Sequence, residues 1–149
     1  MSQNRKKRPT GNHGRRKPLG KTKLLPHTTS YVREQSLYWH LALAAFQTGK
    51  GNGDLLVKLV KALYLAWYLQ QAGFGDAERE LYLEAERILD AAAHGANKDI
   101  WSIATIDCPP IIRILDLHEQ QLLSAPVFAV DEAESRVVRF GKSEKRSPW

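Results

Sequence analysis

The chain has 149 residues, of which 43% are apolar and 26% charged, and this composition is typical of one ordinary globular domain. No segment approaches the roughly 18 consecutive apolar residues of a membrane helix, and no apolar stretch with a cleavage site follows the basic N-terminus. We therefore expect a soluble, cytoplasmic protein without a membrane partner. The single cysteine, Cys108, excludes an internal disulfide and a cysteine-based structural metal site.

Charge is distributed unevenly along the chain. Residues 1–26 carry nine Lys and Arg and no acid, residues 27–135 carry eight against fifteen Asp and Glu, and residues 136–149 carry five against one. The net charges of the three segments are thus +9, −7 and +4. Both ends are basic and the body between them is acidic.

The N-terminal segment has the composition of a disordered basic arm. Its first 26 residues contain three prolines, three glycines and only four apolar side chains besides them: Met1, Leu19, Leu24 and Leu25. So little apolar surface cannot offset the roughly 1 to 2 kcal/mol of backbone entropy that ordering costs per residue. We expect residues 1–28 to form a flexible arm, with a root-mean-square span of about 25 to 30 Å.

The pattern between residues 29 and 126 predicts a helical domain. A first helix is expected from about residue 31 to residue 48, after the cap residues Thr29 and Ser30. Its buried stripe should consist of the apolar side chains that recur at spacings of three and four. These are Leu37, Tyr38, Leu41 and Ala45, and the stripe includes or borders Trp39 and Phe46.

Glycines mark the ends of the next two helices. The second helix, capped by Asn52 or Asp54, should end at Gly73, a natural left-handed terminator. Because only residues 73–75 precede a third helix from Asp76 to about residue 94, we expect an antiparallel hairpin with Phe74 between the two helices. The solvated face of the third helix carries acids that form a candidate protein-binding surface: Glu78, Glu80, Glu84 and Glu86.

The C-terminal third is expected to hold one more helix and a small β element. Residues 96–106 show no clear helical stripe and predict a short strand or an extended loop. Asp107 followed by two prolines predicts a fourth helix to about residue 124. Residues 127–130 and 136–140 are rich in β-forming residues and predict a hairpin, followed by a basic tail to residue 149. The expected fold is mainly α, a small four-helix core with a short β appendage.

Residue types that carry catalysis or bind metals do not cluster in the sequence. Gly20 to Thr22 resemble the end of a phosphate loop, but Arg15 stands where that motif needs glycine and no strand precedes it. His118 and Gln121 resemble half of a helical metal site, yet no further ligand has a matching spacing, so we expect a hydrogen-bonded histidine at the edge of the core. Cys108 is expected to be buried at a helix start. We predict a non-enzymatic protein without catalytic residues, cofactor or metal.

The basic ends favour nucleic-acid phosphates as the ligand, since cations on a flexible backbone can follow a phosphate chain. Phosphate contacts do not read bases, so DNA and RNA both stay open. The alternatives for the arm are a solubility tail or docking on the acidic surface of the same protein or of a second copy. The candidate phosphate-binding residues are Arg5, Lys6, Lys7, Arg8, Arg15, Arg16, Lys17, Lys21, Lys23, Arg136, Arg139, Lys142, Lys145 and Arg146.

A second hypothesis is a protein-interaction module of phage or mobile-element origin that binds its partner through the acidic helix at residues 76–94. A homodimer is also possible, because an apolar side of the first or second helix can stay uncovered in a four-helix core. Two further aromatic residues, Tyr64 and Tyr68, lie one helical turn apart and are candidates for partly exposed interaction residues.

Three stretches resemble a known group of proteins: residues 41–51 (LALAAFQTGKG), 66–75 (AWYLQQAGFG) and 115–126 (LDLHEQQLLSAP). The chain is similar over about residues 31–128 to short uncharacterised helical proteins of proteobacterial genomes, prophages and mobile elements, some of them labelled Fis-family transcriptional regulators. That label implies DNA binding through a C-terminal helix-turn-helix. The sequence departs from this pattern after Pro126, where a β-like basic tail is expected, so no recognition helix and no site residue is assigned from the resemblance.

Overall fold

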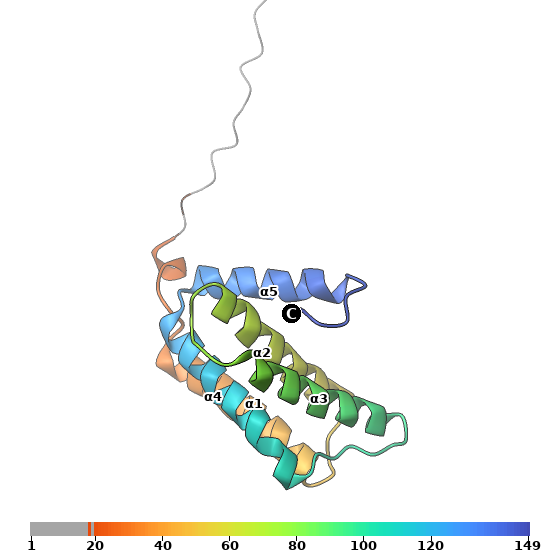
Figure 1. Cartoon of the computed structure of the whole chain (residues 1–149). Coiled ribbons are helices and arrows are strands. Elements are labelled where there is room, and N and C mark those ends of the chain that lie inside the picture. Colours follow the sequence, from red (N-terminus) through yellow and green to blue (C-terminus); the bar gives the residue numbers. More distant parts are fainter. Residues whose placement is uncertain (1–17, 19) are drawn as a thin grey trace, which may run out of the picture.

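The structure, a computed structural model, describes residue 18 and residues 20–149, which form five α-helices and two short 3₁₀ helices (Figure 1). The mainly α prediction is confirmed, whereas the expected β appendage is wrong, because the described residues contain no strand. None of these helices is both long enough and apolar enough to cross a membrane. In chain order the elements are η1 (Lys21–Lys23), α1 (Thr29–Gln47), α2 (Gly53–Gln71), α3 (Arg79–Ala96), η2 (Thr105–Asp107), α4 (Cys108–Ser124) and α5 (Val127–Gly141).

Helix α2 lies at the centre of the packing. It contacts α1, α3, α4 and α5, while α4 also packs against α1 and α3, and α5 lies across α2 at one end of the molecule (Figure 1). Val130 and Ala133 of α5 are 4% and 3% exposed and belong to the same apolar core as the side chains of α1 to α4. Five helices therefore build the core, not the four that the sequence predicted.

Local signals place several helix ends where they were predicted. The side chain of Asn52 accepts a hydrogen bond from the Leu55 amide at 2.9 Å and caps α2. Gly73, which follows α2, has a φ of +97°, in the left-handed region that favours glycine. Two prolines occupy the first turn of α4, where their missing N–H groups are not needed. Of residues 96–106, for which a strand or an extended loop was predicted, residues 100–104 form an extended loop without a strand, whereas residues 105 and 106 belong to η2.

Helix α5 replaces the predicted hairpin of residues 127–140. Val130, Ala133 and Val137 recur at spacings of three and four, so one turn after another presents an apolar side chain to the core. The acidic segment between the two valine-rich pieces is rich in Ala and Glu, which are strong helix formers. Strand propensity depends on the partner surface, and packing against α2 outweighs it here.

Helix α1 buries Trp39 and Phe46, which the predicted stripe included or bordered, but not the leucines at its centre. Leu37 and Leu41 are 60% and 59% exposed, and Tyr38 is also exposed. Contact with α2 and α4 decides which of two overlapping apolar stripes turns inward. The buried residues of α1 are Val32, Ser36, Trp39, Ala42, Leu43 and Phe46.

The described end of the predicted arm contacts α5. The backbone amide of Val127 donates a hydrogen bond to the Leu25 carbonyl at 2.9 Å, and Lys23 forms an ion pair of 2.5 Å with Asp131. Residues 20–28 thus pass beside the start of α5. The rest of the predicted disordered arm, residues 1–17 and 19, lies outside the described residues.

Candidate functional site

Three of the predicted cations gather beside the C-terminal half of α5. Arg136, Arg139 and Lys145 line one open concavity of about 450 Å³ together with Tyr68 of α2. The guanidinium of Arg136 lies over the Tyr68 ring, 5.9 Å from its centroid, which is a cation–π distance. We call these four residues the α5 basic surface. It brings cations from a helix and from the following loop to one concavity, in which Arg136 lies over the aromatic ring.

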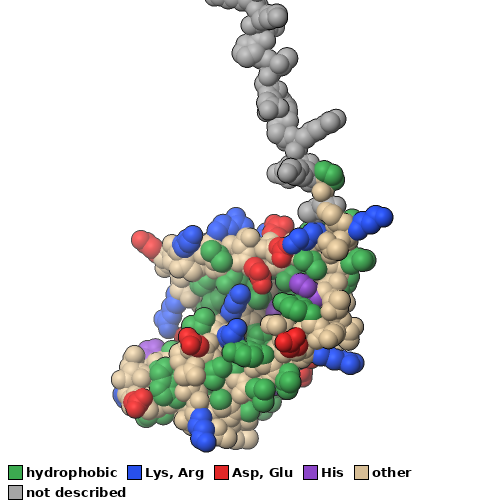
Figure 2. Space-filling view, turned by 180° about the vertical axis from the view of Figure 1, so that it is seen from behind, with side chains coloured by type: hydrophobic (Ala, Val, Ile, Leu, Met, Phe, Trp, Pro, Cys, Tyr) green, Lys and Arg blue, Asp and Glu red, His purple; other side chains and the backbone are tan. Residues whose placement is uncertain are grey.

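Acidic side chains interrupt the positive charge around this surface. Glu132, one turn before Arg136, lines the same concavity. Along α5, at the top of Figure 2, Lys and Arg alternate with Asp and Glu. The α5 basic surface is therefore a local group of cations rather than part of a continuous basic face.

The other predicted phosphate-binding residues lie in different surroundings. Lys21 and Lys142 are exposed. Lys23 is paired with Asp131, and the guanidinium of Arg146 lies 3.8 Å from the Asp90 carboxylate of α3. The remaining candidates fall outside the described residues: Arg5, Lys6, Lys7, Arg8, Arg15, Arg16 and Lys17.

The C-terminal segment of the chain covers part of the acidic face of α3. The hydroxyl of Ser147 donates to the Glu86 carboxylate, with distances of 2.8 and 2.9 Å to its two oxygens. The Trp149 ring packs edge-on against Trp67, with centroids 5.5 Å apart. Together with the Asp90 contact of Arg146, these interactions leave Glu78, Glu80 and Glu84 as exposed acids of the predicted protein-binding surface.

The two tyrosines singled out in the sequence have separate roles. Tyr64 donates a hydrogen bond to Glu86 at 3.0 Å and contacts the ring of Phe140, so it takes part in internal packing. Burial, assisted by the nearby charge of Glu86, raises the pKa of the Tyr64 hydroxyl above its ordinary value. Tyr68 alone remains beside cations, in the α5 basic surface.

His118 lies deeper than the core edge that the sequence predicted, since it is only 1% exposed. Its Nδ1 lies 3.2 Å from Oε1 of Gln121, and Nε2 of Gln121 donates to the carbonyls of Ala66 and Phe74, both at 2.9 Å. Because the Gln121 amide nitrogen faces these two acceptors, its oxygen must accept from His118, and we assign the ring proton to Nδ1. The pair is a buried polar link between α4, α2 and the loop after α2.

Burial lowers the pKa of His118 from 6.5 to about 4, against the weaker opposing effect of its hydrogen bond to Gln121. The ring is thus neutral at neutral pH. It borders a cavity of about 80 Å³ that is also lined by Trp39, Lys58 and Lys61. This volume is smaller than the roughly 150 Å³ that accommodates benzene in an apolar cavity, so it suits water or a small ion.

Cys108 is buried at the first position of α4, as predicted, and is 1% exposed. Its Sγ donates to the carbonyl of Ala104 at 3.4 Å. Burial raises the pKa of the thiol above its ordinary value, which disfavours the nucleophilic thiolate. The surroundings of this cysteine therefore do not activate it.

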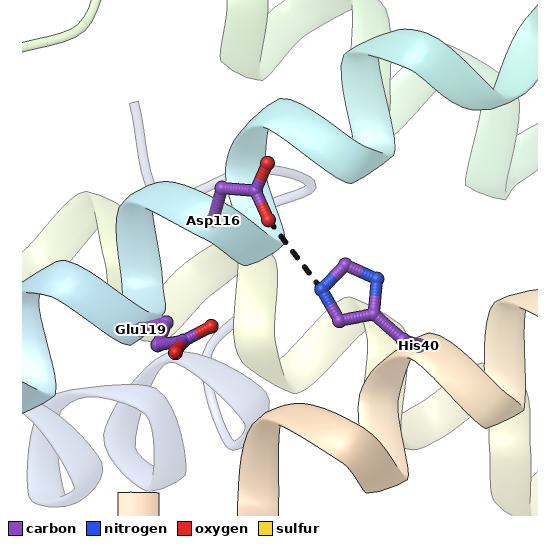
Figure 3. A group of neighbouring side chains, drawn as sticks. All are labelled: His40, Asp116 and Glu119. Atoms are coloured by element: carbon purple, nitrogen blue, oxygen red, sulfur yellow. Dashed lines mark ion pairs between the residues drawn. The ribbon is translucent and has the colours of Figure 1, made fainter. Parts of the chain in front are cut away.

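A group of possible metal ligands that the sequence analysis did not identify lies between α1 and α4 (Figure 3). Nε2 of His40 lies 3.4 Å from Oδ1 of Asp116, and Glu119 lies one turn further along α4. One ligand atom from each of the three residues lies within 4.8 Å of the other two. The i, i+3 spacing of the two acids was the only local signal, because His40 is far away in sequence.

Comparison of the chain with protein-family models, with curated proteins and with solved structures finds no match. The geometry of the described residues and the charge pattern of the sequence are therefore what indicates the function of this protein.

Proposed function

We propose that this protein is a non-enzymatic nucleic-acid-binding protein whose α5 basic surface contacts phosphates, together with the cations of the N-terminal arm. The observation that carries the proposal is that Arg136, Arg139 and Lys145 line one concavity with Tyr68, whose ring lies under Arg136. Cations beside an aromatic ring are the combination that follows a nucleic-acid backbone and stacks on its bases.

The position of α5 also supports the proposal. Only residues 125 and 126 separate α4 from α5, so a C-terminal helix follows where the sequence analysis expected none. The first half of α5 carries Asp131, Glu132 and Glu134, which phosphates repel. A recognition helix contacts bases through its N-terminal residues, so we propose phosphate contacts by the second half rather than base reading.

Removing the three cations is expected to weaken nucleic-acid binding. The triple variant Arg136→Gln, Arg139→Gln, Lys145→Gln should bind duplex DNA or RNA about 10- to 100-fold more weakly at low salt. It makes fewer phosphate contacts, so fewer counterions are released when it binds. The slope of log K against log salt should become shallower by about 2 to 3. Titrations of labelled DNA and RNA at several salt concentrations measure both effects.

A matched control separates this site from net charge. The variant Arg79→Gln, Arg87→Gln, Lys98→Gln removes three exposed cations on or just after α3 and should retain most of the affinity. An equal loss in both triple variants would mean that net charge alone matters. No binding by the wild-type protein at about 50 mM salt, where phosphate contacts are strong, would contradict the proposed function itself.

A second candidate, self-association, is favoured by the exposed apolar face of α1. Leu37 and Leu41 are 60% and 59% exposed on this face, and Tyr38 beside them is 43% exposed with the Lys58 ammonium over its ring. We propose that it pairs with the same face of a second copy, since apolar faces of this kind mark interfaces.

Charge on this face should prevent that association. The variant Leu37→Glu, Leu41→Glu is expected to sediment as a monomer at concentrations at which the wild type is dimeric, because the carboxylates resist burial. The control Val138→Glu places one charge at an exposed apolar position of α5, 56% exposed, and should leave the dimer intact. A monomeric wild type in analytical ultracentrifugation would disprove the dimer.

A further inference from the structure

Beyond nucleic-acid binding, we propose that His40, Asp116 and Glu119 bind a divalent transition-metal ion of the zinc class. They offer one imidazole nitrogen and two carboxylates from two packed helices (Figure 3). Three protein ligands of this kind, completed by water, form an open zinc site.

The separation of the ligand atoms fits an ion between them. A tetrahedral site with metal–ligand bonds of about 2.0 to 2.1 Å places neighbouring ligand atoms about 3.3 to 3.4 Å apart. Nε2 of His40 and Oδ1 of Asp116 are 3.4 Å apart. The same spacing is that of an ion pair, so the two side chains already lie at a distance that an ion between them would require. The third ligand atom, from Glu119, lies within 4.8 Å of both.

Helices α1 and α4 hold the three side chains in position. Asp116 and Glu119 lie on one face of α4 because they are three residues apart, and His40 approaches from α1. Ser36, one turn before His40, is buried and donates its hydroxyl proton to Oε2 of Glu119 at 2.6 Å. This hydrogen bond orients the carboxylate in the way that outer-shell partners orient metal ligands.

The ligand types select the ion. An imidazole nitrogen with two carboxylates suits zinc and related transition metals, whereas calcium and magnesium prefer sites made only of oxygen. The side chain of Asp116 is 64% exposed, so solvent reaches the site and water can fill the remaining coordination positions. An ion would also compensate two carboxylates held close together on one helix.

Zinc titration by calorimetry tests the site, with cobalt absorption as a report on coordination geometry. The full-length wild-type protein should bind one zinc ion in this site, and His40→Ala and Asp116→Asn should each lower its affinity at least 10-fold. Bound cobalt should show the strong visible absorption of a tetrahedral site in the wild type and lose it in both variants. The control is His94→Gln, which alters an exposed histidine of α3 and should leave both signals unchanged.

Three results would overturn the inference. The first is that the wild-type protein does not bind zinc. The second is that His40→Ala and Asp116→Asn bind zinc as tightly as the wild type. The third is that the His94→Gln control loses as much zinc affinity as these two variants. His40 and Asp116 lie at the surface of the α1–α4 contact, and Asp116→Asn preserves the shape of the side chain. We therefore expect the Asp116→Asn variant to fold like the wild type. Equal melting temperatures of the variants and the wild type without metal verify this. The outcome does not depend on nucleic-acid binding, since no cation of the α5 basic surface is altered.

Discussion

Replacing Gln121 with leucine is expected to lower the free energy of unfolding by about 3 kcal/mol. The amide of Gln121 accepts from His118 and donates to the Ala66 carbonyl inside the α2–α4 contact, and it also donates to the partly buried carbonyl of Phe74. Leucine fills a similar volume but leaves the buried His118 N–H and the partly buried Phe74 carbonyl without these partners, and a stranded buried group costs about 1 to 3 kcal/mol. Urea unfolding followed by circular dichroism measures the change.

The neighbouring residue provides the control for this prediction. Gln120 is on the same helix but exposed, so Gln120→Leu should change the unfolding free energy by less than about 0.5 kcal/mol. A small effect of Gln121→Leu, comparable with that of Gln120→Leu, would show that the buried polar link contributes little to stability.

The second large effect is a loss of stability in mild acid that depends on His118. Burial lowers the pKa of this histidine in the folded protein from 6.5 to about 4. Between these two pH values the unfolded chain binds a proton at this site and the folded protein does not, so stability falls as the pH decreases from 6.5 towards 4. At 1.36 kcal/mol per pH unit the loss amounts to about 3 kcal/mol.

The variant His118→Asn isolates this contribution. Asparagine places an N–H donor near the position of Nδ1 and can keep the hydrogen bond to Gln121, but it does not titrate. Urea unfolding at pH 7.5 and 4.5 should therefore show a decrease about 2.5 kcal/mol smaller in the variant than in the wild type. Parallel decreases in the two proteins would place the acid sensitivity in other groups.

Much of the secondary structure was predictable because its causes are local. Asn52 caps α2 through its own neighbouring amides, Gly73 ends it by a backbone conformation that favours glycine, and prolines start α4. Such signals act within a few residues. They need no knowledge of the rest of the chain.

The failures of prediction concern burial, which is not local. Residues 127–140 have strand-forming side chains, yet packing on α2 makes them helix α5. The predicted stripe of α1 had Leu37 and Leu41 at its centre and Trp39 on or beside it. Packing against α2 and α4 buries Trp39 and leaves the two leucines in solvent. Neither choice can be derived from periodicity alone.

The candidate sites divide in the same way. The sequence by itself determined the positions of the cations, the acidic body and the buried cysteine at the start of α4. Only the tertiary structure decided that Arg136, Arg139 and Lys145 line one concavity with Tyr68. It also decided that Arg146 lies beside Asp90. It likewise decided that His40 approaches Asp116 and Glu119. Contacts between residues far apart in the chain depend on how the helices pack, and the spacing of residues along one helix does not specify which helix packs against it.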